Sequence, residues 1–132
     1  MSKIEKFEDL EVWQRAREIC QYVEMLFNET NLGTNYGLRN QMETSSGSIM
    51  DNIAEGFGRD GNKEFHNFLS YSKGSTNELK SQAYRAFDKH LISEEQFEKL
   101  TDLCVIEINK LGAFMYYLRQ SEHKGLKYKN EK

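Results

Sequence analysis

The chain has 132 residues, no proline and a net charge of −3. This length suits one domain with a sizeable core, and a proline-free chain with 38% hydrophobic residues favours an all-α fold. No apolar run is long enough to cross a bilayer, and the N-terminus lacks a signal-peptide pattern, so we expect a cytoplasmic protein. The acidic balance argues against a dedicated nucleic-acid-binding protein.

The first predicted helix covers about residues 9–30. Two sets of apolar residues recur in it every seven positions, Trp13, Cys20 and Phe27 and also Val12, Ile19 and Leu26. The resulting apolar stripe is wider than one core-facing seam needs, so this helix has apolar surface to spare.

The second predicted helix covers about residues 37–56. Its apolar seam consists of Met42, Ile49, Ile53 and Phe57. The middle of the helix, TSSGS, is small and polar, with poor intrinsic helix propensity. We therefore expect tertiary packing to hold it, with small residues allowing a close approach of a neighbouring helix.

The third helix is predicted over about residues 62–90 and the fourth over about residues 94–120. Gly74 lies in the middle of the third helix, opposite its apolar seam. A glycine at this position has two interpretations: it results from neutral drift, or it allows another backbone to approach the helix closely. The fourth helix has the clearest start, because Ser93 and Gln96 form a capping-box pattern.

The linkers between these segments are short, so consecutive helices should be antiparallel neighbours. The prediction is an antiparallel up-down four-helix bundle over residues 1–120. Residues 121–132 hold four lysines and little that can be buried, so we expect a flexible Lys-rich tail. Its Lys124, Lys127 and Lys129 are candidate phosphate contacts.

No pattern in the sequence predicts catalytic residues, a metal site or a cofactor. Four-helix di-iron proteins use Glu-x-x-His pairs, and none occurs here. Phosphate-loop and nucleophile-elbow motifs are also absent from the sequence. Cys20 and Cys104 both fall in apolar helical patterns, so we expect reduced, buried thiols.

The stretch NIAEGFGRD, residues 52–60, is the most distinctive polar segment. Asn52, Glu55 and Arg59 share one stripe of the second helix, away from its apolar seam, and Glu78 is a candidate partner for Arg59. One interpretation is a structural network that links this helix to the third helix or to another subunit. The other interpretation is a recognition site for a partner or a small ligand.

Four segments in order resemble a known family. These are FEDLEVWQRARE at 7–18, YGLRNQ at 36–41, SIMDNIAEGFGR at 48–59 and KEFHNFLSYSKGSTNEL at 63–79. Together they are similar to the bacterial four-helix bundle proteins labelled the 23S rRNA intervening-sequence protein family. The resemblance covers about residues 7–120. It implies a left-handed bundle, no enzymatic activity and often a ring-shaped homopentamer.

The resemblance extends to accessory proteins of diversity-generating retroelements, which bind a reverse transcriptase and nucleic acid. Our first hypothesis is a non-enzymatic homo-oligomer that docks another macromolecule. The alternatives are a nucleic-acid-binding accessory subunit, possibly of a reverse transcriptase, and a small-ligand site at residues 52–59. For the oligomer we predict an interface around Tyr71, Gly74 and Ser75, where a glycine admits a second backbone and a tyrosine supplies an anchor.

Overall fold

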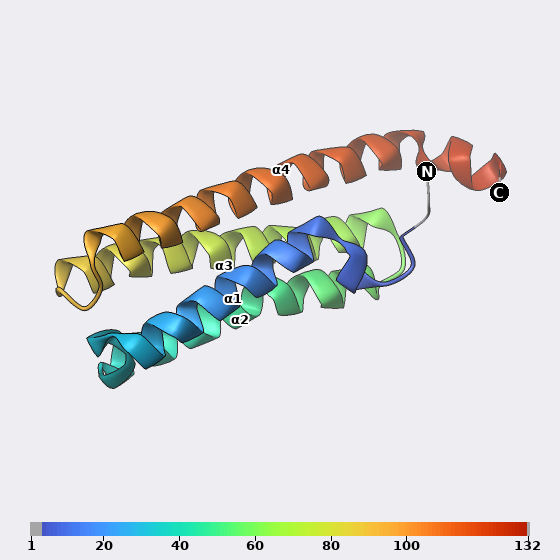
Figure 1. Ribbon diagram of the computed structural model, residues 1–132. Coiled ribbons are helices and arrows are strands. Elements are labelled where there is room, and N and C mark those ends of the chain that lie inside the picture. Colours follow the sequence, from blue (N-terminus) through green and yellow to red (C-terminus); the bar gives the residue numbers. More distant parts are fainter. Residues whose placement is uncertain (1–3, 132) are drawn as a thin grey trace.

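The computed structural model describes the backbone of residues 4–131 and the side chains of residues 4–121. Within this range all regular secondary structure is helical, and there is no strand. The elements are η1 (Phe7–Asp9), α1 (Glu11–Glu29), η2 (Asn31–Thr34), α2 (Tyr36–Phe57), α3 (Asn62–Asp88) and α4 (Glu94–Glu131). Figure 1 shows the four α-helices running up and down side by side, which confirms the predicted all-α, antiparallel four-helix architecture.

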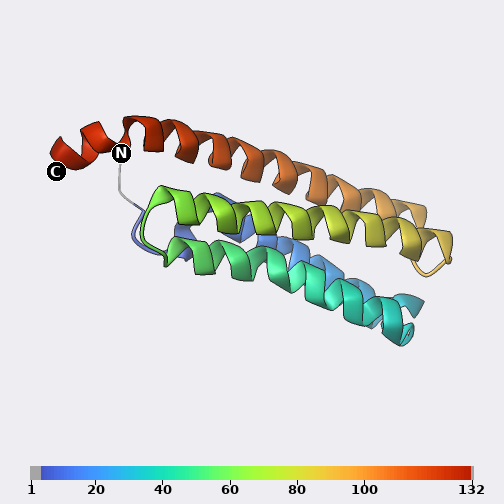
Figure 2. The ribbon, with the colours of Figure 1, turned by 180° about the vertical axis from the view of Figure 1, so that it is seen from behind.

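The four neighbouring helix pairs are not packed equally. α2 and α3, and likewise α3 and α4, stay in contact along most of their length, whereas α1 and α4 make the fewest contacts. Figure 2 shows α3 between α4 and α2, beside both of them along the bundle. The α1–α4 seam, meaning the contact between these two helices, is therefore the loosest of the four.

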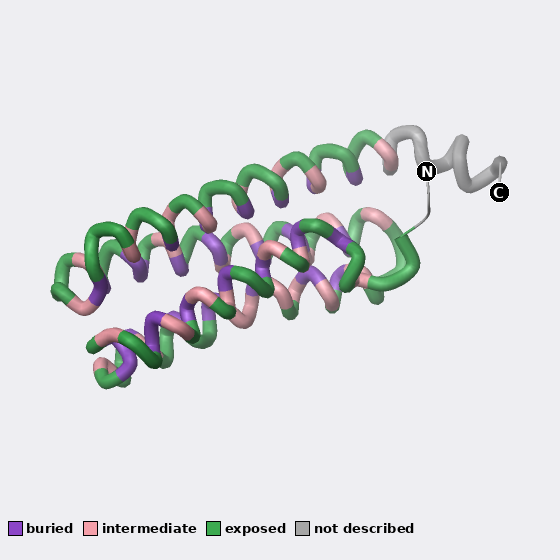
Figure 3. The backbone as a smooth tube through the Cα atoms, in the orientation of Figure 1, coloured by how far each residue is buried: buried purple, intermediate pink, exposed green. Residues whose placement is uncertain are grey.

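The core runs along the middle of the bundle, where each helix turns its apolar stripe inward (Figure 3). The largest apolar side chains buried there include Ile19, Leu26, Met42, Ile49, Ile53, Leu69, Leu79, Leu100 and Leu111. Each such side chain contributes about 1.5–3 kcal/mol when removed from water. Predicted seam residues from all four helices are among them, because the 3.6-residue period places them on one face.

Helix ends follow local hydrogen-bonding chemistry. The predicted capping box at the start of α4 is present. The Ser93 backbone N–H donates to Gln96 Oε1 at 2.9 Å, and the Gln96 backbone N–H donates to Ser93 Oγ at 3.1 Å. Asn35 caps α2 by accepting from the Leu38 backbone N–H at 3.3 Å. α1 begins at Glu11, two residues later than predicted, because residues 7–9 form a separate 3₁₀ turn.

The backbone of α4 continues as helix to Glu131, past the predicted end near residue 120. The side chains of residues 122–132 lie outside the described part of the chain. The flexible tail and the phosphate contacts of Lys124, Lys127 and Lys129 therefore stay predictions. Among the helices that the structure describes, none combines the length and apolar character required to cross a membrane.

Candidate functional site

Asn52 belongs to a small hydrogen-bonded group that joins α2 to α3. Its Nδ2 donates to the Ser48 carbonyl oxygen at 2.9 Å and to Ser48 Oγ at 2.8 Å. From α3, Ser75 Oγ donates to the same Ser48 Oγ at 2.9 Å. Both amide protons are thus used within the chain, and the arrangement is a structural link between the two helices.

Glu55 and Arg59 form an ion pair on the surface of α2. Arg59 Nη2 lies 2.7 Å from Glu55 Oε1, and both side chains are about half exposed. The hydrogen bond that Arg59 donates to Glu55 raises the pKa of Arg59 above its ordinary value. The guanidinium also stands 5.1 Å from the Phe68 ring centroid, so it touches α3 through a cation–π contact.

The structure does not bring Glu78 to Arg59. Glu78 is exposed on α3 and shares no ion pair or hydrogen bond with Arg59 within the described part of the chain. Arg59 meets α3 at Phe68, ten residues earlier. Ten residues of helix correspond to about 15 Å, which is beyond the reach of both side chains.

Gly56 lies inside α2 at a point where there is no room for a side chain. A β-carbon built on Gly56 would lie 2.5 Å from Phe68 Cβ, closer than carbon atoms can approach. The absence of a side chain lets α2 and α3 come together at this point, where Phe57 and Phe65 also meet edge to face at 6.0 Å. The NIAEG segment is therefore a close-packing point between helices.

Tyr71, Gly74 and Ser75, the predicted interface residues, do not all face outward. Tyr71 is 58% exposed, with its ring edge-on to Phe68 at 5.6 Å. Gly74 is exposed, and a β-carbon built on it would have no atom within 4 Å. Ser75 instead turns into the contact between α2 and α3. We call Tyr71 and Gly74, with the outward side of α3 between them, the α3 surface.

A second exposed surface was missed by the sequence prediction. Four apolar side chains on the outward side of α4 are 39–60% exposed, namely Val105, Ile106, Tyr116 and Tyr117. Asn109 and Ala113, also exposed, lie between them. The signal was the stretch VIEINKLGAFMYYL, which is apolar on more than its inner face. We call this region the α4 surface.

Glu107 is the other feature that sequence reasoning missed. It is fully buried on α4, and neither carboxylate oxygen has a hydrogen-bond partner within the described part of the chain. Burial raises the pKa of Glu107 to about 8, and Arg15 on α1 opposes this rise only in part. Its spacing from Cys104 and Leu111, three and four residues away, was the available signal, because these neighbours belong to the core.

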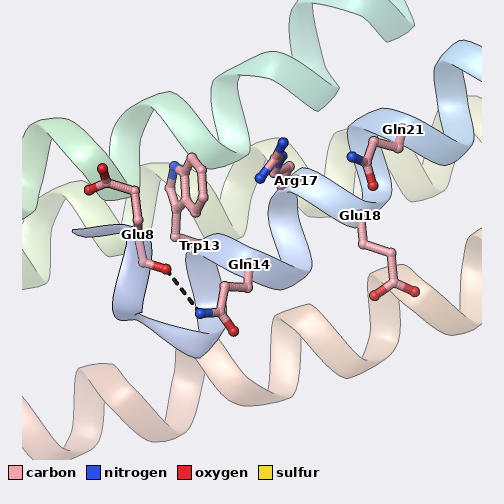
Figure 4. A pocket seen from close by; sticks show the side chains of 6 residues that line it. All are labelled: Glu8, Trp13, Gln14, Arg17, Glu18 and Gln21. Carbon is pink, nitrogen blue, oxygen red and sulfur yellow. Dashed lines mark hydrogen bonds between the residues drawn. The ribbon is translucent and has the colours of Figure 1, made fainter. Parts of the chain in front are cut away.

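A hollow lies over the outward side of α1 (Figure 4), lined by Glu8, Trp13, Gln14, Arg17, Glu18 and Gln21. The Gln14 side chain donates to the Glu8 carbonyl oxygen at 2.9 Å, and the Arg17 guanidinium stands 5.9 Å from the Trp13 ring centroid. The charges in the lining are mixed in sign, so they favour no particular ligand. Among the described side chains, no three His, Cys, Asp or Glu residues group in a way that could hold a metal ion.

The described part of the chain is thus an antiparallel all-α bundle of four helices. Residues 8–113 match the 23S rRNA-intervening sequence protein family, and the chain belongs to that family. This confirms the resemblance carried by the four sequence segments.

The bundle is also similar to a solved structure from Bacteroides thetaiotaomicron, a protein with unknown function from the S23 ribosomal protein family. The two share 20% sequence identity with a TM-score of 0.72, and the match covers 79% of this chain and 97% of the other. At this identity the likeness shows the shared fold alone. No protein with a curated description matches the chain significantly.

Proposed function

We propose that the protein is a non-catalytic assembly module, a homo-oligomer that presents its outer surfaces to another macromolecule. The observation that carries this proposal is the α4 surface. Between Asp102 and Arg119 the outward side of α4 has one charged residue, Lys110, and exposes two aliphatic and two tyrosine side chains. From Val105 to Tyr117 this apolar strip is about 18 Å long.

Grouped apolar side chains of this kind favour a protein partner. Scattered exposed apolar residues are ordinary, whereas contiguous ones mark an interaction surface. Tyrosine is enriched at such surfaces, because its ring buries a large area while its hydroxyl stays hydrated. Lys110, at the edge of the strip, is already held by Glu11 on α1 at 3.2 Å.

The α3 surface supplies a second, different face. Among the described residues Gly74 has no neighbour that requires a glycine, although a mid-helix glycine costs about 1 kcal/mol relative to alanine. Two unlike faces on one molecule suit head-to-tail contacts, which close into a ring when the rotation between copies allows it. The family resemblance implies five copies in that ring.

The test is the mass in solution, measured by size exclusion with light scattering over micromolar concentrations. We expect the wild type to exceed the 15.5 kDa of one chain. Combining Ile106→Glu with Tyr116→Glu should reduce the mass to a monomer while circular dichroism stays unchanged. The matched control, Gln21→Glu with Asn28→Glu, adds the same charge at two exposed positions on α1. A monomeric wild type would overturn the proposal.

Nucleic-acid binding is the alternative that the lysines of residues 121–132 favour. For a chain of net charge −3 we expect no tight complex with RNA or DNA at about 150 mM salt. A tight, salt-dependent complex that disappears when residues 121–132 are deleted would replace the present proposal. Thermal stabilisation by a small molecule, abolished by Arg59→Ala, would instead favour a ligand site at residues 52–59.

A further inference from the structure

The Glu107 carboxyl is buried in the bundle, where an apolar side chain would pack at lower cost. Its side chain is fully removed from solvent, and neither oxygen accepts or donates a hydrogen bond within the described part of the chain. An unpaired carboxylate in such surroundings is strongly unfavourable, so the group is held as the neutral acid. Burial accordingly raises the pKa of Glu107 to about 8.

The charged and titratable groups around Glu107 come from three helices. From α1, Arg15 attracts a negative charge on Glu107 and Glu11 repels it. On α4 itself, Cys104 lies one turn before Glu107, and Lys110 lies one turn after it. From α3, Lys80 acts on Cys104, and Lys73 Nζ would lie 4.0 Å from a β-carbon at Gly112.

Arg15 and Lys110 are both engaged in ion pairs with Glu11. Arg15 Nε lies 2.7 Å from Glu11 Oε2, and Lys110 Nζ lies 3.2 Å from the same oxygen. These ion pairs sit on the solvent edge of the α1–α4 seam, outside the buried carboxyl. For Arg15 to pair with an ionised Glu107 it would have to leave Glu11.

We propose that the α1–α4 seam is a proton-sensitive joint, closed while the buried Glu107 carboxyl is neutral and opened when that carboxyl ionises. Opening lets water or Arg15 solvate the new charge. It is directed to this seam because α1 and α4 make the fewest contacts among neighbouring helices. The α2–α3 and α3–α4 contacts are more extensive and hold the remaining three helices together.

The sign of the pH effect follows from linkage. In the open state the carboxyl has an ordinary pKa of about 4.3, while in the closed state its pKa is about 8. The open state therefore binds fewer protons between these values, and the opening constant rises by at most about tenfold per pH unit. Above pH 8 the rise levels off, because both states are ionised.

Cys104 offers a direct probe of opening, because it is fully buried three residues before Glu107. In a Cys20→Ser background it is the single thiol, and its labelling by an uncharged maleimide reports opening. The ratio of this rate to that of the same protein carrying Glu107→Gln cancels the intrinsic pH dependence of the thiol. Between about pH 6 and pH 8 we expect this ratio to rise at least fivefold, and at most about fiftyfold.

Two controls make the result decisive. Glu98→Gln changes an exposed carboxyl of the same helix and should leave the wild-type rise intact. In a Cys104→Ser background, Cys20 reports on the contact between α1 and α2, where its thiol donates to the Ser46 carbonyl oxygen at 3.2 Å. A smaller rise at Cys20 supports a joint at the α1–α4 seam. A ratio that stays constant, or an equal rise at both thiols, overturns the proposal.

Discussion

The α2–α3 seam, meaning the contact between these two helices, differs from the α1–α4 seam in how its buried polar groups are hydrogen-bonded. Both place polar groups inside the bundle, but the polar groups between α2 and α3 are short and satisfied. Ser72 Oγ donates to the Ile49 carbonyl oxygen at 2.8 Å, and Ser45 Oγ donates to Gln82 Oε1. Between α1 and α4 the buried polar group is the Glu107 carboxyl, which has no hydrogen-bond partner among the described residues.

This difference indicates which helix contacts contribute most to the stability of the bundle. Hydroxyls that bond to helix backbone, together with Gly56, allow α2 and α3 to approach closely, so dispersion contacts are dense. At the α1–α4 seam the hydrogen-bonded charges lie at the surface, where screening leaves them little net effect. Added atoms in the α2–α3 seam should therefore lower the free energy of unfolding. Removal of the buried carboxyl from the α1–α4 seam should raise it.

The largest expected effect comes from filling the α2–α3 seam. Gly56→Ala places a β-carbon 2.5 Å from Phe68 Cβ, which no side-chain rotation can relieve, so the helices must separate. We expect a loss of about 3 kcal/mol in the free energy of unfolding. Urea denaturation monitored by circular dichroism would measure it. Gly47→Ala is the control, because a β-carbon at Gly47 meets nothing within 4 Å. Equal effects at both positions would contradict the close approach.

The second effect runs in the other direction. Glu107→Leu removes a carboxyl that must ionise at a cost as the pH rises, so it should stabilise the protein by about 2 kcal/mol at pH 8. The pKa of Glu107 is raised on folding, so wild-type stability falls between about pH 4.5 and pH 8. The advantage of Glu107→Leu should accordingly grow across this range and be small near pH 5. Denaturant unfolding at three pH values would measure it, and a pH-independent difference would contradict it.

The third effect tests the satisfied polar groups. Ser72 is fully buried, and Ser72→Ala leaves the Ile49 carbonyl oxygen without this donor. We expect a loss of about 1 kcal/mol, the net contribution of a neutral buried hydrogen bond. The same denaturation experiment measures it, with Ser70→Ala, an exposed neighbour on α3, as the control. No difference between the two variants would show that the hydroxyl adds nothing to the seam.

The same contrast explains what could be predicted from the sequence. The number, order and direction of the helices followed from apolar periodicity and short linkers, because those properties are local. Gly56 was recognised as part of a motif, but its contact with Phe68 depends on how closely two helices approach. The pairing of Arg59 with Glu78 depends likewise on how α2 and α3 are positioned along one another. It is not formed among the described residues, where Arg59 pairs with Glu55.

Glu107 and the α4 surface were missed for a different reason. Glutamate is rarely buried, so composition alone gives no reason to place a carboxyl in the core, although the spacing of Glu107 from Cys104 and Leu111 is that of a core position. For α4 the sequence prediction named no outward apolar residue, although Tyr116 and Tyr117 cannot both face the core with Leu118. In both cases the position of the residue around the helix carried the signal.

The smallest expected effect on the single chain concerns Gly74, the counterpart of Gly56 on the open side of α3. A β-carbon there has no atom of residues 4–121 within 4 Å, so Gly74→Ala should stabilise the helix by up to about 1 kcal/mol through helix propensity alone. Gly74→Leu points a larger side chain outward and should leave the monomer helical while it disrupts an assembly that uses the α3 surface. Light scattering with circular dichroism on both variants separates these effects. If Gly74→Leu assembles as the wild type does, the α3 surface is not an interface, and the α4 surface alone accounts for self-association.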